Sequence, residues 1–262
     1  MKNQAQRLAL VFAFPLVLPL AFSFAGCAGK KSKELTKTES ARMILDIAAG
    51  AINEKDPTDA LEKIQFAESL DPSLPEIPFL KSLAFEQKND LSRATIEIKK
   101  ALTLNPKSSA VNAQLGKLML EQGHPADAVR PLTQAANDPL YREAYRARTN
   151  LGILHYRRGE LDLAAKHMKR AVTENPLMSC MAHYYLGHIA LKAGKFDEAI
   201  RSYDRSTRSI CGGFADGHYA LGVAYQRSRK IEDARKKFLS VQQQFPRTAA
   251  AERSLDHLRE LQ

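Results

Sequence analysis

Six alanines recur along this chain at nearly constant spacing. They are Ala60, Ala94, Ala128, Ala164, Ala199 and Ala234, and successive members lie 34, 34, 36, 35 and 35 residues apart. A bulky apolar residue follows each one after four positions: Ile64, Ile98, Leu132, Met168, Tyr203 and Phe238. A fixed period of this length indicates one supersecondary unit repeated along the chain. Most of the chain is therefore expected to form an elongated array in which each repeat contacts only its neighbours.

Each unit contains the signals of two helices. Four units carry a Leu-Gly pair upstream of the alanine, and the glycine allows two helices to approach closely: Leu115-Gly116, Leu151-Gly152, Leu186-Gly187 and Leu221-Gly222. The first two units have Ala48 and Ser82 in place of that glycine. A proline ends the second helix in four units, because proline cannot continue a helix interior: Pro72, Pro106, Pro176 and Pro246.

This pattern resembles the tetratricopeptide repeat. The resemblance predicts an all-α, right-handed superhelical solenoid of six tetratricopeptide helix pairs over residues 41–247. Apolar residues at Ala251, Leu255, Leu258 and Leu261 predict a C-terminal capping helix over residues 248–262. Arrays of this kind bind other proteins, so a binding scaffold is the expected class.

The first 26 residues have the organisation of an export signal. Lys2 and Arg7 precede an uncharged apolar run over residues 8–24, which is short for a membrane span and is interrupted by two prolines. Small residues then lead to Cys27, as in the bacterial lipobox, where the cysteine thiol is acylated. We expect a lipoprotein signal peptide over 1–26, a lipid-anchored Cys27 and a flexible tether over 27–40. An ordinary secretory signal with an incidental cysteine is the alternative.

Charge and motif content argue against catalysis and nucleic-acid binding. The formal net charge is +10, but the basic residues are scattered, and export would separate the protein from nucleic acid. The seven histidines form no metal-ligand motif, and the chain has no phosphate-binding loop or nucleophile elbow. No enzyme activity, cofactor, metal site or small-molecule substrate is therefore expected.

Two further cysteines, Cys180 and Cys211, are predicted to form a disulfide. Cys180 opens the first helix of the fifth unit, and Cys211 occupies the slot where other units place the terminal proline. Because the helices of a pair run antiparallel, these two positions fall at the same end of the pair. An oxidising compartment would favour the bridge. Two buried free thiols are the alternative.

The first helix of each unit is expected to line a partner-binding groove. In tetratricopeptide arrays the second, fifth, ninth and twelfth positions of that helix usually contact the ligand, and here these positions are mainly aliphatic and aromatic. Such a strip suits an amphipathic segment, although several members could instead pack neighbouring helices or lie beneath the terminal helix. The predicted groove residues are Leu45, Ala49, Ile52, Phe79, Leu83, Leu120, Ile153, Tyr156, Tyr184, Leu191, Tyr219 and Val223; Lys117, Thr149 and His188 occupy equivalent positions.

The fourth unit is longer than the others. Two extra residues fall within the stretch 138–146, where Tyr141, Tyr145 and Arg146 either form a secondary contact or bury the junction. The Leu140-Tyr141 pair followed by Asn150-Leu151-Gly152, together with Cys27 and six units, resembles the pilotins, the type IV pilus biogenesis and stability lipoproteins.

The pilotin resemblance implies a location and a partner. It implies an outer-membrane lipoprotein on the periplasmic face that binds secretin subunits and promotes their outer-membrane localisation and multimerisation. A generic periplasmic tetratricopeptide lipoprotein, acting as an adaptor for peptidoglycan enzymes or outer-membrane assembly factors, is the alternative.

Overall fold

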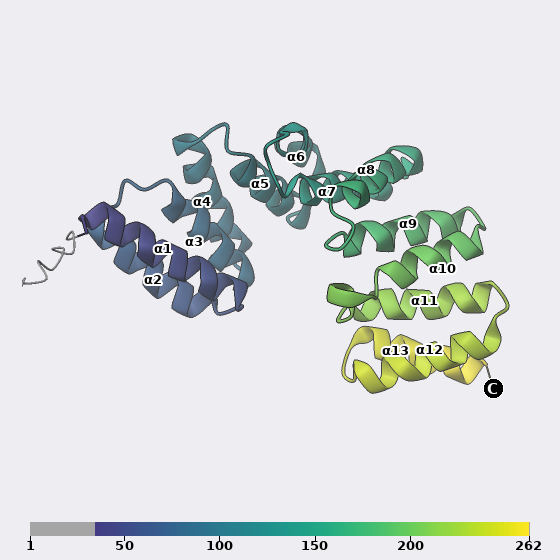
Figure 1. Cartoon of the computed structure of the whole chain (residues 1–262). Helices are drawn as coiled ribbons and strands as arrows, with labels where there is room; N and C mark the ends of the chain where they lie inside the picture. The colour runs from purple at the N-terminus through teal and green to yellow at the C-terminus, as the bar shows by residue number, and fades with distance from the viewer. Residues whose placement is uncertain (1–34, 262) are drawn as a thin grey trace, which may run out of the picture. The chain divides into compact units, whose positions relative to one another are not determined.

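The computed structural model describes residues 35–261 and places thirteen α-helices in that range (Figure 1). They are α1 (Lys37–Asn53), α2 (Pro57–Leu70), α3 (Glu76–Gln87), α4 (Leu91–Leu104), α5 (Ser109–Glu121), α6 (Pro125–Asn137), α7 (Ala144–Arg157), α8 (Leu161–Glu174), α9 (Cys180–Lys192), α10 (Phe196–Arg205), α11 (Ala215–Arg227), α12 (Ile231–Gln244) and α13 (Ala249–Glu260), with a 3₁₀ turn at Ser209–Cys211. Consecutive helices pair from α1/α2 to α11/α12, and α13 packs on α11 and α12. The described residues thus contain the six predicted pairs and the capping helix.

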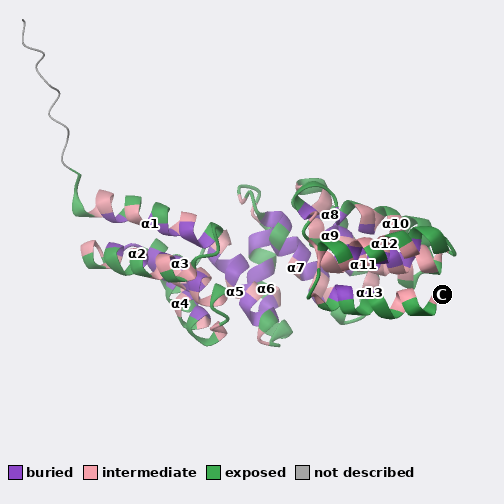
Figure 2. Cartoon of the chain, turned by 90° about the horizontal axis from the view of Figure 1, so that it is seen from below, coloured by how far each residue is buried: buried purple, intermediate pink, exposed green. Residues whose placement is uncertain are grey.

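The repeat alanines and their bulky partners form the centre of each pair. All six alanines and all six residues four positions later are completely buried, with 0% of their surface exposed. Figure 2 shows these buried stretches as purple bands on helices whose other faces are green and exposed. Small and large side chains therefore alternate through the core, which extends along the array as a series of linked clusters.

The repeat glycines face those same bulky residues. A Cβ on Gly152 would lie 2.6 Å from Met168, a Cβ on Gly187 would lie 2.6 Å from the Tyr203 ring, and one on Gly222 would lie 2.6 Å from Phe238. Gly116 meets Leu132 in the same way. The four glycines are therefore required by close helix contact. The first two units, which have Ile64 and Ile98 in the bulky slot, carry the larger Ala48 and Ser82.

One residue in every turn within a pair adopts a left-handed backbone conformation. It lies five positions before each repeat alanine: Lys55 (φ 63°), Asn89 (φ 58°), Gly123 (φ 78°), Gly159 (φ 78°), Gly194 (φ 70°) and Arg229 (φ 59°). Glycine adopts this conformation without steric cost, whereas lysine and arginine do not. Three turns therefore have glycine, one has asparagine, which tolerates this conformation, and two have a residue that does not favour it.

The first helix begins earlier than the sequence analysis placed it. Residues 37–40, predicted as part of the tether, form the first turn of α1. The reason is a capping box: Thr36 Oγ1 accepts from the Glu39 N–H at 3.1 Å, and Glu39 Oε2 accepts from the Thr36 N–H at 2.8 Å. The predicted signal peptide, Cys27 and the part of the tether up to residue 34 lie outside the described residues. Within 35–261, no helix combines the length and apolar character needed to cross a bilayer.

Candidate functional site

The odd-numbered helices line one face of the array, called here the inner face, and its first half contains a groove of about 640 Å³. The groove is formed by the C-terminal end of α1, by α3 and α5, and by the start of α7 with the residues before it. Ile52, Phe79 and Leu83, three of the predicted groove residues, line it together. Phe79 and Leu83 also pack on the core of the first repeats, so their orientation is fixed.

The other side of the groove is polar, which corrects the expectation of a mainly apolar strip. The Glu86 carboxylate on α3 pairs with Lys117 Nζ and accepts a hydrogen bond from Gln114 Nε2, both from α5. Lys117 Nζ also lies 3.8 Å from Glu121 Oε1. Burial raises the pKa of the Glu121 carboxyl, partly offset by Lys117. This side of the groove is polar because the third unit has Lys117 directly after its glycine, at the position where the second unit has Leu83.

The inserted stretch before α7 completes the groove. Tyr141, Glu143, Arg146 and Asn150 all line it. Burial raises the pKa of the Tyr141 hydroxyl to about 12, so this group is protonated and able to donate a hydrogen bond at neutral pH. Arg146 Nε donates to Tyr145 Oη at 3.0 Å. Tyr145 itself is buried, so of the two alternatives for this stretch, Tyr145 buries the junction while Tyr141 and Arg146 face the groove.

Several predicted groove residues are not available to a partner. Leu45 and Leu120 are buried in the core clusters between helices and do not line the groove, so their assignment to the groove is corrected. The reason is the rotation of each first helix, which turns these positions towards the neighbouring pair. Ala49, Ile153 and Leu191 are partly buried and pack against core clusters. Val223 on α11 is partly buried. Thr149 on α7 is buried, and its Oγ1 donates to Tyr145 O at 2.8 Å.

In the second half of the inner face, aromatic rings occupy the equivalent positions. Tyr184 lies 4.3 Å from His188 and 5.8 Å from Tyr203 between ring centroids, and Tyr156 lies 5.0 Å from Tyr185. We call these five residues the aromatic cluster. Burial raises the pKa of Tyr184 to about 12 and lowers that of His188 to about 4, so both are neutral at pH 7. Lys192 Nζ stands 4.6 Å above the Tyr156 ring, a cation–π contact at the margin of the cluster.

Tyr219, the last aromatic residue in the predicted groove, lies beneath the terminal helix. Its hydroxyl is 3.0 Å from His257 Nε2, and the Arg253 guanidinium stands 4.3 Å above its ring, both from α13. The alternative in which the capping helix crosses the inner face is therefore correct at this residue. The groove residues that remain open are concentrated on α1–α7.

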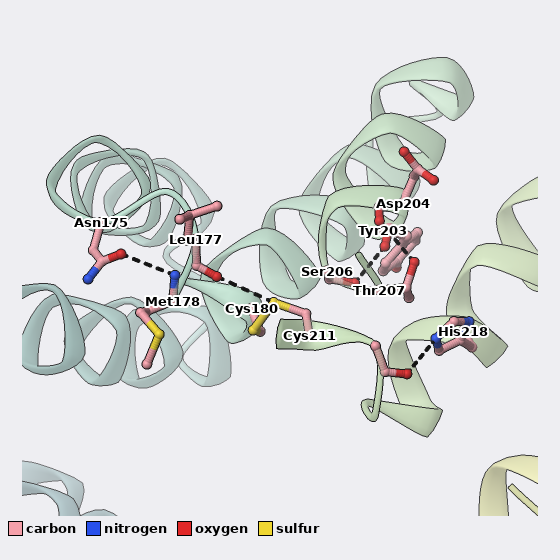
Figure 3. Close-up of a disulfide and its surroundings, with 11 residues drawn as sticks. Asn175, Leu177, Met178, Cys180, Tyr203, Asp204, Ser206, Thr207, Cys211 and His218 are labelled. Atoms are coloured by element: carbon pink, nitrogen blue, oxygen red, sulfur yellow. Dashed lines mark hydrogen bonds between the residues drawn. A yellow bond between two sulfur atoms is a disulfide. The ribbon is translucent and has the colours of Figure 1, made fainter. Parts of the chain in front are cut away.

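Cys180 and Cys211 are joined as a disulfide in the structure (Figure 3), with their Cα atoms 5.6 Å apart. The bond connects the start of α9 with the 3₁₀ turn that follows α10, at the same end of the helix pair. Cys211 Sγ also lies 3.6 Å from the Leu177 carbonyl oxygen. The connection before α9 and the connection after α10 are thus held against each other.

The chemistry of the groove is that of a binding surface. An apolar wall of Ile52, Phe79 and Leu83 faces a wall of paired charges and amides from the end of α3, from α5 and from α7, which matches a segment with one apolar and one polar side. No group of three or more metal-ligating side chains occurs within residues 35–261. Sequence reasoning missed Glu86, Gln114 and Asn150; the only available signal was that each lies within one helical turn of a predicted groove position.

Comparisons with known proteins identify the repeat. The sequence profile of the tetratricopeptide repeat matches residues 114–179 and 184–247, from within α5 to just past α12. A TPR repeat-containing protein of Methanocaldococcus jannaschii is 30% identical over 95 residues, or 36% of this chain and 16% of that protein. The type IV pilus assembly protein PilF of Pseudomonas aeruginosa is 23% identical over 165 residues, or 61% of this chain and 66% of PilF.

Solved structures show the same architecture. The crystal structure of PilW, described as a widely conserved type IV pilus biogenesis factor, superposes with a TM-score of 0.71 at 20% identity, covering 83% of this chain and 99% of PilW. The P. aeruginosa PilF structure gives a TM-score of 0.71 at 18% identity, covering 84% and 99%. The described chain is therefore a tetratricopeptide solenoid. Its structural and sequence neighbours include the pilus proteins PilF and PilW.

Proposed function

We propose that this protein is an outer-membrane lipoprotein scaffold for type IV pilus assembly. It binds secretin subunits in the groove of α1–α7 and promotes their outer-membrane localisation and multimerisation. The observation that carries the proposal is the position of Tyr141 and Asn150. Both belong to the irregular fourth unit on which the pilotin resemblance rests, and both line the groove beside Phe79 and Leu83. The alignment with nearly the whole length of PilW and PilF supports it.

The groove suits a segment that must be kept from aggregating. A secretin subunit carries an amphipathic membrane-inserting segment before it assembles. The apolar wall shields one side of such a segment, while Lys117, Glu86 and Asn150 offer hydrogen bonds to the other. Binding through apolar contact plus a few directed polar groups gives affinity and fixes orientation.

Deletion of the gene, followed by an assay for heat-stable secretin multimers, tests the function. Multimers should be lost in the deletion strain, and normal multimers would remove the proposal in favour of a general envelope adaptor.

Cys27→Ala should release the protein from the membrane fraction. Retention of this variant in the outer membrane would contradict lipid anchoring at Cys27.

Charged substitutions in the groove test the binding surface. The double variant Phe79→Glu with Leu83→Glu should prevent secretin multimerisation. Binding would bury two unpaired carboxylates against the apolar side of the segment, which is costly. The matched control is Phe66→Glu with Ile96→Glu, which places the same charges at exposed positions on α2 and α4. Equal activity of the two double variants would show that the groove is not the contact.

A further inference from the structure

The connections between repeats form one edge of the solenoid, and they carry the most exposed apolar side chains of the described chain. Leu140, between α6 and α7, is 88% exposed, and Leu177, between α8 and α9, is 68% exposed. Met178, beside Leu177, is 46% exposed. Ile210, in the 3₁₀ turn after α10, is 58% exposed. We call these three connections the loop edge. Its apolar tips recur once per repeat.

The tips are held by the structure. The Leu140 N–H donates to Asp138 Oδ1 at 2.9 Å, and the Met178 N–H donates to Asn175 Oδ1 at 3.1 Å. The disulfide fixes the turn that carries Ile210 against the connection that carries Leu177, as Figure 3 shows for Leu177, Met178 and the two cysteines. Exposed apolar side chains on fixed turns lose little conformational freedom when they enter another phase.

Basic side chains accompany these tips. Arg205, Arg208 and His183 line a cavity of about 360 Å³ beside Leu177, and Arg142 and Arg170 line a second cavity that also contains Arg148. The acidic groups nearby are already engaged. Asp204 pairs with Arg208, Glu174 lies 2.6 Å from Arg148 and 3.3 Å from Arg170, and Asp138 accepts from Ser109 and Leu140. Arg142 and Arg205 make no ion pair within the described residues.

We propose that the loop edge of repeats four to six is a contact surface for an anionic lipid bilayer. Single aliphatic side chains flanked by arginines match the interfacial region of a membrane, where apolar tips enter the acyl boundary and guanidinium groups meet lipid phosphates. A protein partner fits less well. The tips are leucine, isoleucine and methionine side chains with no aromatic residue among them, whereas protein interfaces concentrate aromatic anchors in a packed centre. The proposal does not depend on secretin binding, because the connections that carry Leu177 and Ile210 contribute no residue to the groove, although Tyr141 beside Leu140 does.

The absence of tryptophan from the chain allows a site-specific test. Leu140→Trp, Leu177→Trp and Ile210→Trp, each in the full-length protein, are mixed with vesicles of phosphatidylcholine and phosphatidylglycerol that contain brominated lipid. Phe196→Trp is the matched control, because Phe196 starts α10 at the opposite edge and is also partly exposed. Residues 1–34 are the same in every variant, so only the local environment of each tryptophan differs.

The proposal predicts a blue shift and quenching at positions 140, 177 and 210, with no change at position 196. Removing Arg205 and Arg208 (R205Q with R208Q, in the Leu177→Trp background) should abolish the signal at 177, whereas R158Q with R227Q, which removes the same charge at the opposite edge, should leave it. Absence of quenching at all three loop positions overturns the proposal. This is the result expected if the edge binds a protein instead of lipid. Equal quenching at 196 overturns it too.

Discussion

The two halves of the inner face have the same helical scaffold but differ in what fills it. Over α1–α7, the side chains leave a groove of about 640 Å³ with an apolar and a polar wall. Over α7–α13, the aromatic cluster fills the corresponding positions, and α13 covers Tyr219. The repeat geometry therefore sets where the inner-face side chains lie. The volume of those side chains decides whether they leave an open groove or pack against one another. In a solenoid, stability and binding can thus be assigned to different repeats.

The largest expected effect lies in the filled half. Tyr203→Ala should lower the free energy of unfolding by about 3–5 kcal/mol, because it removes a completely buried ring and leaves a cavity against Gly187. Phe79→Ala in the open half should cost about 1 kcal/mol, since its side chain is only partly buried. Chemical denaturation of both variants gives the comparison, and equal losses would contradict the difference in burial between the Tyr203 and Phe79 side chains.

Tyr203→Phe is the control for that experiment. The Tyr203 hydroxyl is buried without a hydrogen-bond partner among the described residues, and the sixth repeat has Phe238 in the same slot. Removing the hydroxyl should raise the free energy of unfolding by about 1 kcal/mol. A loss of stability would show that the hydroxyl is satisfied.

The disulfide lies in the filled half alone. Cys180→Ser with Cys211→Ser should lower the free energy of unfolding by about 3–4 kcal/mol, the entropy of closing a loop of this length in the unfolded chain. Denaturation with and without reductant separates the bond from the substitution: reductant should destabilise the wild type and leave the double variant unchanged. An equal response of the two proteins would contradict a disulfide at these positions.

The aromatic cluster should make the filled half sensitive to acid. Burial lowers the pKa of His188 from 6.5 to about 4, so the unfolded state binds a proton more readily than the folded state. The stabilisation is therefore complete above pH 6.5 and is lost as the pH falls towards 4. His188→Gln should flatten the dependence of unfolding free energy on pH in this window. Burial also lowers the pKa values of His167, His183 and His218, so some dependence should remain.

The smallest effect should be the same in both halves. Lys55→Gly in the open half and Arg229→Gly in the filled half each relieve a left-handed residue that is not glycine. Each should raise the free energy of unfolding by about 0.5–1 kcal/mol, the steric relief less the entropy that glycine loses on folding. Thermal denaturation of the two variants checks this; a gain confined to one half would mean that turn strain also distinguishes them.

Much of the fold follows from local sequence signals. A helix contact can be predicted from Ala199, Tyr203 and Gly187. Small residues at a fixed distance from a large one indicate that two helices pack closely, as Gly187 and Tyr203 do here. Thr36 and Glu39 have the spacing of a capping box, a local signal that the expected tether over 27–40 overlooked. The groove was harder to predict. Leu45 and Leu120 satisfy the positional rule yet are buried, since the rotation of each helix against the next pair is set by packing over the whole array.

The sequence pattern did not show which groove residues a distant segment would cover, although coverage by the terminal helix was one of the alternatives. Tyr219 occupies a groove position, but only the docking of α13, over thirty residues later, removes it from solvent. The pairing of Glu86 with Lys117 joins two repeats and has no periodic signature. Leu140 was read as part of a family-like stretch, whereas its 88% exposure is a property of the turn that carries it.

The contact between each repeat glycine and its bulky partner has a consequence for how such a chain can change over evolutionary time. Both residues belong to the same helix pair: Gly187 on α9 meets Tyr203 on α10, and Gly222 on α11 meets Phe238 on α12. A gene segment encoding a whole pair therefore carries a matched fit with it. A crossover between the two helices would set Tyr203 against Ser82 or Ala48 and produce a clash. The helix pair is the smallest unit of this chain that can be duplicated, deleted or exchanged intact.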